Sequence, residues 1–194
     1  MNHVAHCLLS FGDEDLLLGN FIGDFVKGSD WRNYPPGVQK GILLHRRIDS
    51  FTDQHPVVEQ SVARMRPFAG RWTPPFVDIL YDHLLILNWE AQTEQSFEAF
   101  AQASYQMLMR RADEMPAVLR ERLPRMVEGR FLHGYQQREG VEWVLDKFSH
   151  RLSTVVDVRA LAGHFFGRLT EYQADFDTFF PELAAHAYAF SKSE

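Results

Sequence analysis

The chain has 194 residues, 45% of them hydrophobic, and a net charge of -6, so it can bury a core and is not a disordered chain. It has no apolar run near the roughly 18 residues that a membrane span needs, its start MNHVAHCLLS lacks the positive region of a secretory signal, and its single cysteine forms no internal disulfide. We therefore expect one domain over residues 1–194 that is cytoplasmic, avoids membranes and, being acidic, does not bind nucleic acid.

Helical periodicity runs along the whole sequence, and strand signals are nearly absent. The first two helices are the least regular because Gly12, Gly19 and Gly23 interrupt their pattern. Several later helices begin at or just after prolines, or at Ser96, which are common first-turn and N-cap residues. In chain order we expect helices at Val4–Leu9, Asp15–Val26, Gly37–Asp53, Pro74–Trp89, Ser96–Met115, Pro116–Gly129, Arg138–Leu152, Asp157–Phe180 and Pro181–Phe190. This pattern predicts an all-α domain of about eight to ten helices.

Two of these helices place ionisable residues on the face that should be buried. His45 and Asp49 are four residues apart, so they point the same way from one helix, beside Ile42 and Ile48. On the helix after Pro75, His83 lies on the apolar stripe with Asp82 beside it. Burying such groups is costly unless they meet a cation, a hydrogen-bond network or a metal.

The N-terminal segments add further groups of the same kind. His6 lies in a short apolar stretch, and Asp24 lies between Ile22 and Phe25. Imidazole and carboxylate ligands together suit Mn²⁺, Fe²⁺ or Mg²⁺ better than a thiolate zinc site. The residues predict a shared metal site that draws on His6, Asp24, His45, Asp82 and His83. The alternative is that each histidine is a hydrogen-bonded core residue.

Four sequence motifs identify a family. The opening MNHVAH, then LLGNFIGDFVKG, GILLHRRIDSFTDQHP and DILYDHLL, resemble the acyl carrier protein phosphodiesterase family in order and spacing. The resemblance covers essentially the whole chain, and its last third matches through aromatic helical character ending in FDTFFPEL. It implies a divergent relative of the HD-type metal-dependent phosphohydrolases, with an HD-domain-like helical core. The usual adjacent His-Asp pair is absent, because His45 and Asp49 are separated by a helical turn and Asp82-His83 runs in reverse.

The resemblance also implies an activity. Members of the family hydrolyse the phosphodiester that joins 4'-phosphopantetheine to a serine of holo-acyl carrier protein, with Mn²⁺ as the typical metal and Mg²⁺, Fe²⁺ or Co²⁺ as substitutes. In this chain Asp49 would orient the attacking water, accept its proton or add a ligand, and Arg46 would stabilise charge on the phosphoryl oxygens.

An acidic carrier protein needs a local basic surface on this acidic chain. We expect it to include Lys40, Arg47, Arg64 and Arg66. A second group, Arg120, Arg122 and Arg125, is interpreted as a solvated helix face.

Two other functions fit the same residues. The first is an HD-type phosphohydrolase that acts on nucleotides or small phosphoesters. The second is a helical binding protein in which the histidines and aspartates form a buried polar network without metal.

Overall fold

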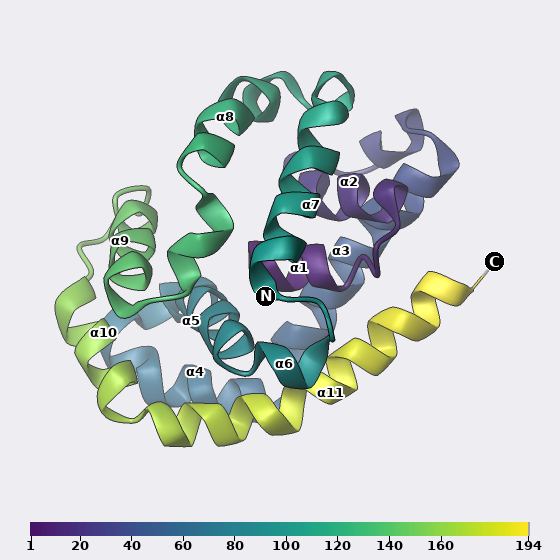
Figure 1. The fold of residues 1–194 in the computed structure, drawn as a ribbon. Helices are drawn as coiled ribbons and strands as arrows, with labels where there is room; N and C mark the ends of the chain where they lie inside the picture. The colour runs from purple at the N-terminus through teal and green to yellow at the C-terminus, as the bar shows by residue number, and fades with distance from the viewer. Residues whose placement is uncertain (194) are drawn as a thin grey trace.

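The structure is a computed structural model that describes residues 1–193, and over these residues it contains helices and no β-strand (Figure 1), which confirms the all-α prediction. Five short 3₁₀ segments also occur in the described chain, among them η1 (Gly23–Phe25), η2 (Asp30–Asn33) and η5 (Phe131–Tyr135). The α-helices are α1 (His3–Leu8), α2 (Glu14–Ile22), α3 (Pro36–Gln54), α4 (Pro56–Ala69), α5 (Thr73–Leu87), α6 (Trp89–Gln92), α7 (Phe97–Arg110), α8 (Ala117–Glu128), α9 (Arg138–Ser149), α10 (Val158–Gly167) and α11 (Leu169–Lys192).

Helix α4 is an element that the sequence analysis did not anticipate. It begins directly after α3, with Pro56 in its first turn, where a proline loses no helical hydrogen bond. The ring of His55 caps it, because its Nδ1 accepts a hydrogen bond from the backbone N–H of Val57 at 3.3 Å. The change of direction at His55 therefore separates two helices with almost no connecting loop.

The C-terminal helices divide at a different residue from the one predicted. The sequence predicted the boundary at Pro181, but the helices are separated at Arg168, between the end of α10 and the start of α11, and Pro181 lies inside α11. An internal proline removes one helical hydrogen bond and usually kinks a helix without ending it. In Figure 1 the yellow final part of α11 rises at an angle to the rest of the helix.

The contact between α2 and α3 brings the site together. A Cβ atom built on Gly19 would lie 2.2 Å from the carbonyl oxygen of Val38, and one built on Gly41 would lie 2.6 Å from the carbonyl oxygen of Leu16. The two backbones can approach this closely because both crossing positions are glycine. Gly19, predicted to interrupt a helix, is instead an interior residue of α2.

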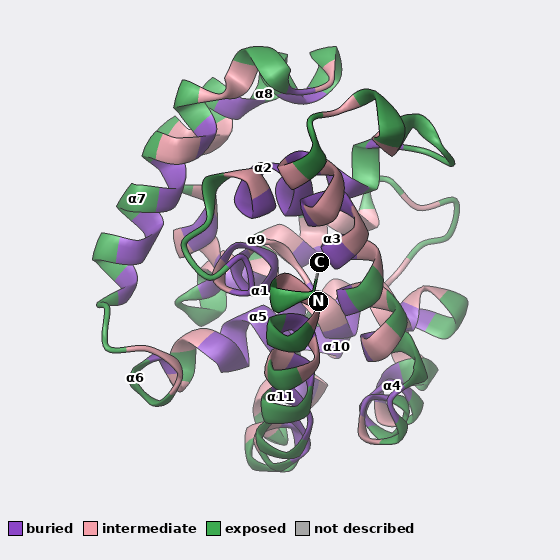
Figure 2. Cartoon of the chain, turned by 90° about the vertical axis from the view of Figure 1, so that its right-hand side faces the viewer, coloured by how far each residue is buried: buried purple, intermediate pink, exposed green. Residues whose placement is uncertain are grey.

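Burial follows the helix faces (Figure 2). Almost all of α2 is buried, whereas α8 exposes most of its residues to solvent. The solvated face of α8 agrees with the interpretation of Arg120, Arg122 and Arg125 as surface residues. None of the described helices is both long and apolar enough to cross a membrane.

Candidate metal centre

Two histidines and one aspartate from two helices come together, His6 from α1 and His45 and Asp49 from α3. The Nε2 atom of His6 lies 3.1 Å from Asp49 Oδ1, and the Nε2 atom of His45 lies 3.1 Å from Asp49 Oδ2. The two imidazole rings are stacked, with centroids 4.2 Å apart. One ligand atom from each of the three residues lies within 4.8 Å of the other two, a grouping that could hold a metal ion.

Asp24 lies at the open side of this cluster. Its Oδ1 atom is 3.3 Å from His45 Nε2, and 74% of its side chain is exposed. It comes from η1, which continues α2 towards α3. We call His6, Asp24, His45 and Asp49 the metal cluster.

Asn20 orients both histidines of the metal cluster. Its side-chain Oδ1 accepts a hydrogen bond from His6 Nδ1 at 2.7 Å, and its backbone oxygen accepts one from His45 Nδ1 at 2.9 Å. The amide orientation is consistent, because Asn20 Nδ2 donates to the carbonyl oxygen of His6 at 2.8 Å. A histidine that donates from Nδ1 presents the lone pair of Nε2, as metal-binding histidines commonly do.

Gly23 makes room for the second ring. A Cβ atom on Gly23 would lie 2.3 Å from the ring of His45, so a larger residue would displace the imidazole. Asn20 and Gly23 lie within the motif LLGNFIGDFVKG, but neither was predicted from the sequence to belong to the site. A buried asparagine in an apolar segment was the available signal, since buried polar groups need partners.

Several nitrogen-to-oxygen distances in the metal cluster are close to the spacing of neighbouring ligands around an octahedral metal. Neighbouring ligands about 2.1 Å from such a metal lie roughly 3.0 Å from each other. The three nitrogen-to-oxygen distances in the metal cluster are 3.1, 3.1 and 3.3 Å. The same distances are those of hydrogen bonds, so these side chains share protons in this structure and could instead hold a metal ion.

The charges of the metal cluster are strongly coupled. Burial and the neighbouring ring of His45 lower the pKa of His6. Burial alone would lower the pKa of His45 too, but hydrogen bonds to Asp24 and Asp49 raise it to about 9. Burial would raise the pKa of Asp49, yet its bonds to the two histidines hold that pKa far below its usual value. The carboxylates therefore stay ionised, as metal ligands must.

A second pair of charges lies next to Asp49. The α-amino group of Met1 is 2.9 Å from Asp78 Oδ1 and 4.0 Å from Asp49 Oδ1. Burial lowers the pKa of this amine, but Asp78, Asp49 and Asp82 together raise it above its ordinary value. The amine is therefore a buried cation that neutralises part of the acidic charge beside the metal cluster.

The predicted ligands Asp82 and His83 do not join this grouping. Asp82 is fully buried, and its carboxylate accepts backbone hydrogen bonds at the start of α1. His83 is turned away, and its Nδ1 donates to the carbonyl oxygen of Tyr135 at 2.7 Å. Helical spacing predicted that both side chains are buried. Asp82 is buried against the backbone of α1, and His83 is buried against η5.

The predicted arginine for phosphoryl charge is engaged with a loop. Arg46 Nη2 donates to the carbonyl oxygens of Val26 and Gly28, each at 3.0 Å. These bonds hold the segment between η1 and η2, which follows Asp24, against α3.

The four predicted docking residues have different surroundings. Arg47 is exposed on α3 and lies over the ring of Phe190, with 4.5 Å between guanidinium carbon and ring centre. Lys40 is half-buried and donates to the carbonyl oxygen of Ser193. Arg64 is in an ion pair with the buried Asp175 of α11, so it joins two helices. Arg66 is exposed on α4.

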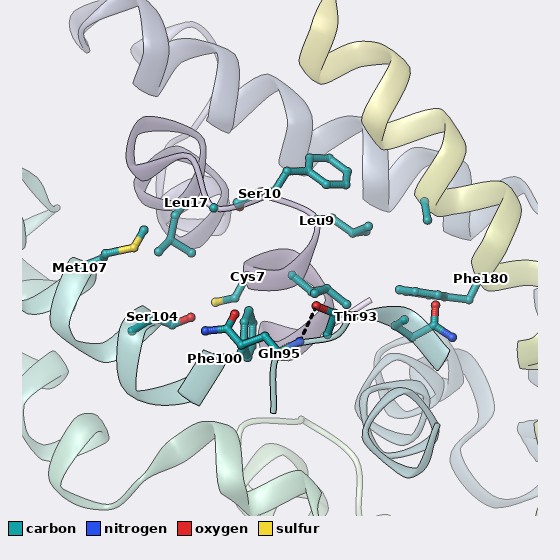
Figure 3. A pocket seen from close by; sticks show the side chains of 16 residues that line it. Cys7, Leu9, Ser10, Leu17, Thr93, Gln95, Phe100, Ser104, Met107 and Phe180 are labelled. Carbon is teal, nitrogen blue, oxygen red and sulfur yellow. Dashed lines mark hydrogen bonds between the residues drawn. The ribbon is translucent and has the colours of Figure 1, made fainter. Parts of the chain in front are cut away.

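Two hollows occur elsewhere on the described surface. A cavity of about 450 Å³ is bordered by the end of α1 and by α7 and α11, with Cys7, Phe100, Met107 and Phe180 among its lining residues (Figure 3). No residue of the metal cluster lines it. A shallower hollow of about 610 Å³ includes Arg47.

Comparisons with known proteins agree with one another. A family model described as acyl carrier protein phosphodiesterase matches residues 1–183. A protein of that name from Yersinia pestis is 29% identical over 191 residues, covering 96% of this chain and 97% of that protein. One from Enterobacter sp. (strain 638) is 30% identical over 159 residues, covering 78% and 79%. One from Salmonella dublin is 28% identical over 198 residues, covering 96% and 97%. No solved structure matches this chain.

Proposed function

The chain belongs to the acyl carrier protein phosphodiesterase family, and on this premise we propose that it hydrolyses holo-acyl carrier protein at the metal cluster. Water adds to phosphorus and the bond from phosphorus to the serine oxygen breaks. The serine oxygen takes a proton, which gives apo-acyl carrier protein, and the phosphate leaves with 4'-phosphopantetheine.

The observation that carries this assignment is the convergence of His6 Nε2, His45 Nε2 and the two oxygens of Asp49. Each contact is 3.1 Å long, and both rings are held from behind by Asn20. Elsewhere in the described chain no other group of His, Cys, Asp and Glu side chains has this compactness. A hydrolase of phosphodiesters needs such a convergence because phosphoryl transfer depends on positioning and charge stabilisation.

His6, His45 and Asp49 would hold a divalent metal, which we propose to be Mn²⁺, with Mg²⁺, Fe²⁺ or Co²⁺ as substitutes. The mixed nitrogen and oxygen donors favour a metal of this class over a thiolate zinc site. When bound, the metal supplies a Lewis acid that polarises phosphoryl oxygens and lowers the pKa of water.

The remaining groups act on the water and the substrate. Asp24 has one oxygen against His45 and is 74% exposed, so its other oxygen can orient the attacking water from the solvent side. Asp49 is already engaged by both histidines, which favours the ligand role among the roles expected for it. Arg46 holds the loop that follows Asp24 through two hydrogen bonds. Positioning Asp24 is therefore at least as important a role for it as stabilising charge on the phosphate.

Docking of the acidic carrier protein is assigned to the basic residues of α3 and the neighbouring loop. Arg47 is exposed on α3, and Lys27 and Arg32 are exposed between α2 and α3. Arg64 is not included in this docking surface, because its charge is paired with that of Asp175. Complementary charge of this kind raises the association rate and is screened by salt.

The deciding experiment is to incubate the protein with holo-acyl carrier protein and follow the carrier by intact mass. We expect conversion to the apo mass with Mn²⁺, and none with EDTA or with the Asp49→Ala variant. Asp53→Ala is the matched control, because Asp53 lies one turn further along α3 and is exposed outside the metal cluster. Conversion in EDTA would refute the requirement for a metal. Full activity of Asp49→Ala would refute the metal cluster as the active site.

The family and the relatives all carry acyl carrier protein in their descriptions, so the nucleotide alternative is not favoured. Adding nucleotides to the same assay tests it directly. Free nucleotides turning over faster than holo-acyl carrier protein would reverse this preference.

A further inference from the structure

Helix α1 carries His6 but is too short to be stable by itself. It has six residues, from His3 to Leu8, whereas isolated helices shorter than roughly 12–15 residues are marginal in water. The position of His6 relative to α3 must therefore be set by tertiary contacts at the two ends of α1.

One end is held by Asn20 and Ser10. Asn20 Nδ2 and Ser10 Oγ both donate to the carbonyl oxygen of His6, at 2.8 and 2.9 Å. These bonds fix the last turn of α1 against α2, on the side where the ring of His6 also contacts Asn20.

The other end is held by Asp82 of α5, which bonds to the backbone of α1, and by the contact of the Met1 amine with Asp78 of the same helix. Asp82 Oδ2 accepts from the backbone N–H of Val4 at 2.6 Å, and Oδ1 accepts from those of Asn2 and Ala5 at 3.2 and 3.3 Å. The first N–H groups of a helix have no partner within it, and a negative charge there is favourable. Asp82, Val4 and Ala5 all have no exposed surface, so water does not take the place of Asp82 as the acceptor for the Val4 and Ala5 amides.

We propose that Asp82 is a positioning residue for the metal cluster, which anchors α1 so that His6 Nε2 stays within bonding range of a metal held by His45 and Asp49. This inference rests on the proposed metal centre, and it replaces the ligand role that the sequence analysis expected for Asp82. Both oxygens of Asp82 are committed to the backbone of α1, and across the described chain it makes no ion pair with either histidine of the cluster.

The test compares Asp82→Ala and Asp82→Asn with the wild-type protein. The first readout is Mn²⁺ affinity by calorimetry, and the second is hydrogen exchange of the Val4 and Ala5 amides without metal. Asp175→Ala is the matched control, because Asp175 is also a buried carboxylate but pairs with Arg64 between α4 and α11.

In Asp82→Ala we expect Mn²⁺ affinity to fall roughly 10–100-fold, as for other groups that orient metal ligands, and both amides to exchange faster. Asp82→Asn keeps one acceptor oxygen and nearly the same volume, so it should fold. Its Mn²⁺ affinity and its amide exchange rates should lie between those of the wild-type protein and Asp82→Ala. Asp175→Ala should lower stability while leaving Mn²⁺ affinity and these two amides unchanged.

Unchanged Mn²⁺ affinity in both Asp82 variants would overturn the inference. Weaker Mn²⁺ binding with unchanged amide exchange would overturn it as well, because that pattern indicates a direct ligand. The wild-type titration tests the metal centre separately from the variants. Failure of the wild-type protein to bind Mn²⁺ would refute the proposed metal centre itself.

Discussion

Replacing Asp49 with alanine removes the one carboxylate that contacts both histidines of the metal cluster. Its two oxygens lie 3.1 Å from His6 Nε2 and from His45 Nε2, and without it the stacked rings have no anion between them. We expect the Asp49→Ala variant to be less stable without metal and to gain no stability when Mn²⁺ is added.

The size of both effects follows from the surroundings of Asp49. A hydrogen bond to a charged group contributes roughly 1.5–3 kcal/mol, but 38% of the side chain is exposed. Screening by water reduces the two contacts to about 1–2 kcal/mol in total. In a chain of this length each kcal/mol shifts Tm by roughly 2–4 °C, so the metal-free Tm should fall by about 2–8 °C.

The metal adds a second, larger difference. Mn²⁺ at about 100 times its Kd stabilises the folded protein by about 2.7 kcal/mol. This corresponds to a rise in Tm of roughly 5–11 °C in the wild-type protein, and the variant should show none.

Thermal unfolding with EDTA and with Mn²⁺ measures both quantities. Asp53→Ala serves as the control on the same helix and should keep the full response to Mn²⁺. If the Tm of Asp49→Ala rises with Mn²⁺ as much as that of the wild type, Asp49 is not a ligand of the metal.

Three further predictions concern pH, turnover and docking. Burial lowers the pKa of His45, but hydrogen bonds to Asp24 and Asp49 raise it to about 9, so binding Mn²⁺ at lower pH must displace a proton. The Kd for Mn²⁺, measured by calorimetry, should fall roughly tenfold for each unit by which pH rises between about pH 6 and 8. A Kd that does not change with pH would contradict this. Asp24→Asn should lower kcat by roughly 10²–10⁴-fold with KM nearly unchanged; steady-state kinetics showing a normal kcat would exclude Asp24 from orienting the water. Arg47→Glu should raise KM for holo-acyl carrier protein and weaken its salt dependence, whereas Arg120→Glu on α8 should change neither, and equal responses would remove Arg47 from the docking surface.

Local sequence was sufficient for features that depend on one helix. The helical class followed from periodicity, and Ser96 was predicted as an N-cap because its hydroxyl can accept an early backbone N–H, as it does from Ala99 at 3.3 Å. His45 and Asp49 were expected to point the same way because residues four apart share a helix face, and their side chains do meet at 3.1 Å. The prolines were less informative, since Pro181 lies inside α11.

Features that depend on two helices were not determined by local sequence. Asp82 and His83 satisfy the same buried-face pattern as His45 and Asp49, yet Asp82 meets the backbone of α1 and His83 meets Tyr135. Periodicity predicts that a residue is buried but does not predict which segment covers it. That information comes from how the helices pack against one another.

The sequence by itself therefore determined the helical class, the family resemblance and the shared direction of His45 and Asp49. Only the tertiary structure decided that, of the other predicted ligands, His6 and Asp24 join them while Asp82 and His83 do not. It alone showed that Asn20 orients both rings and that Asp82 bonds to the start of α1. The physical reason is the close crossing of α2 and α3 at Gly19 and Gly41, together with the anchoring of α1, because these contacts join segments that are distant along the chain.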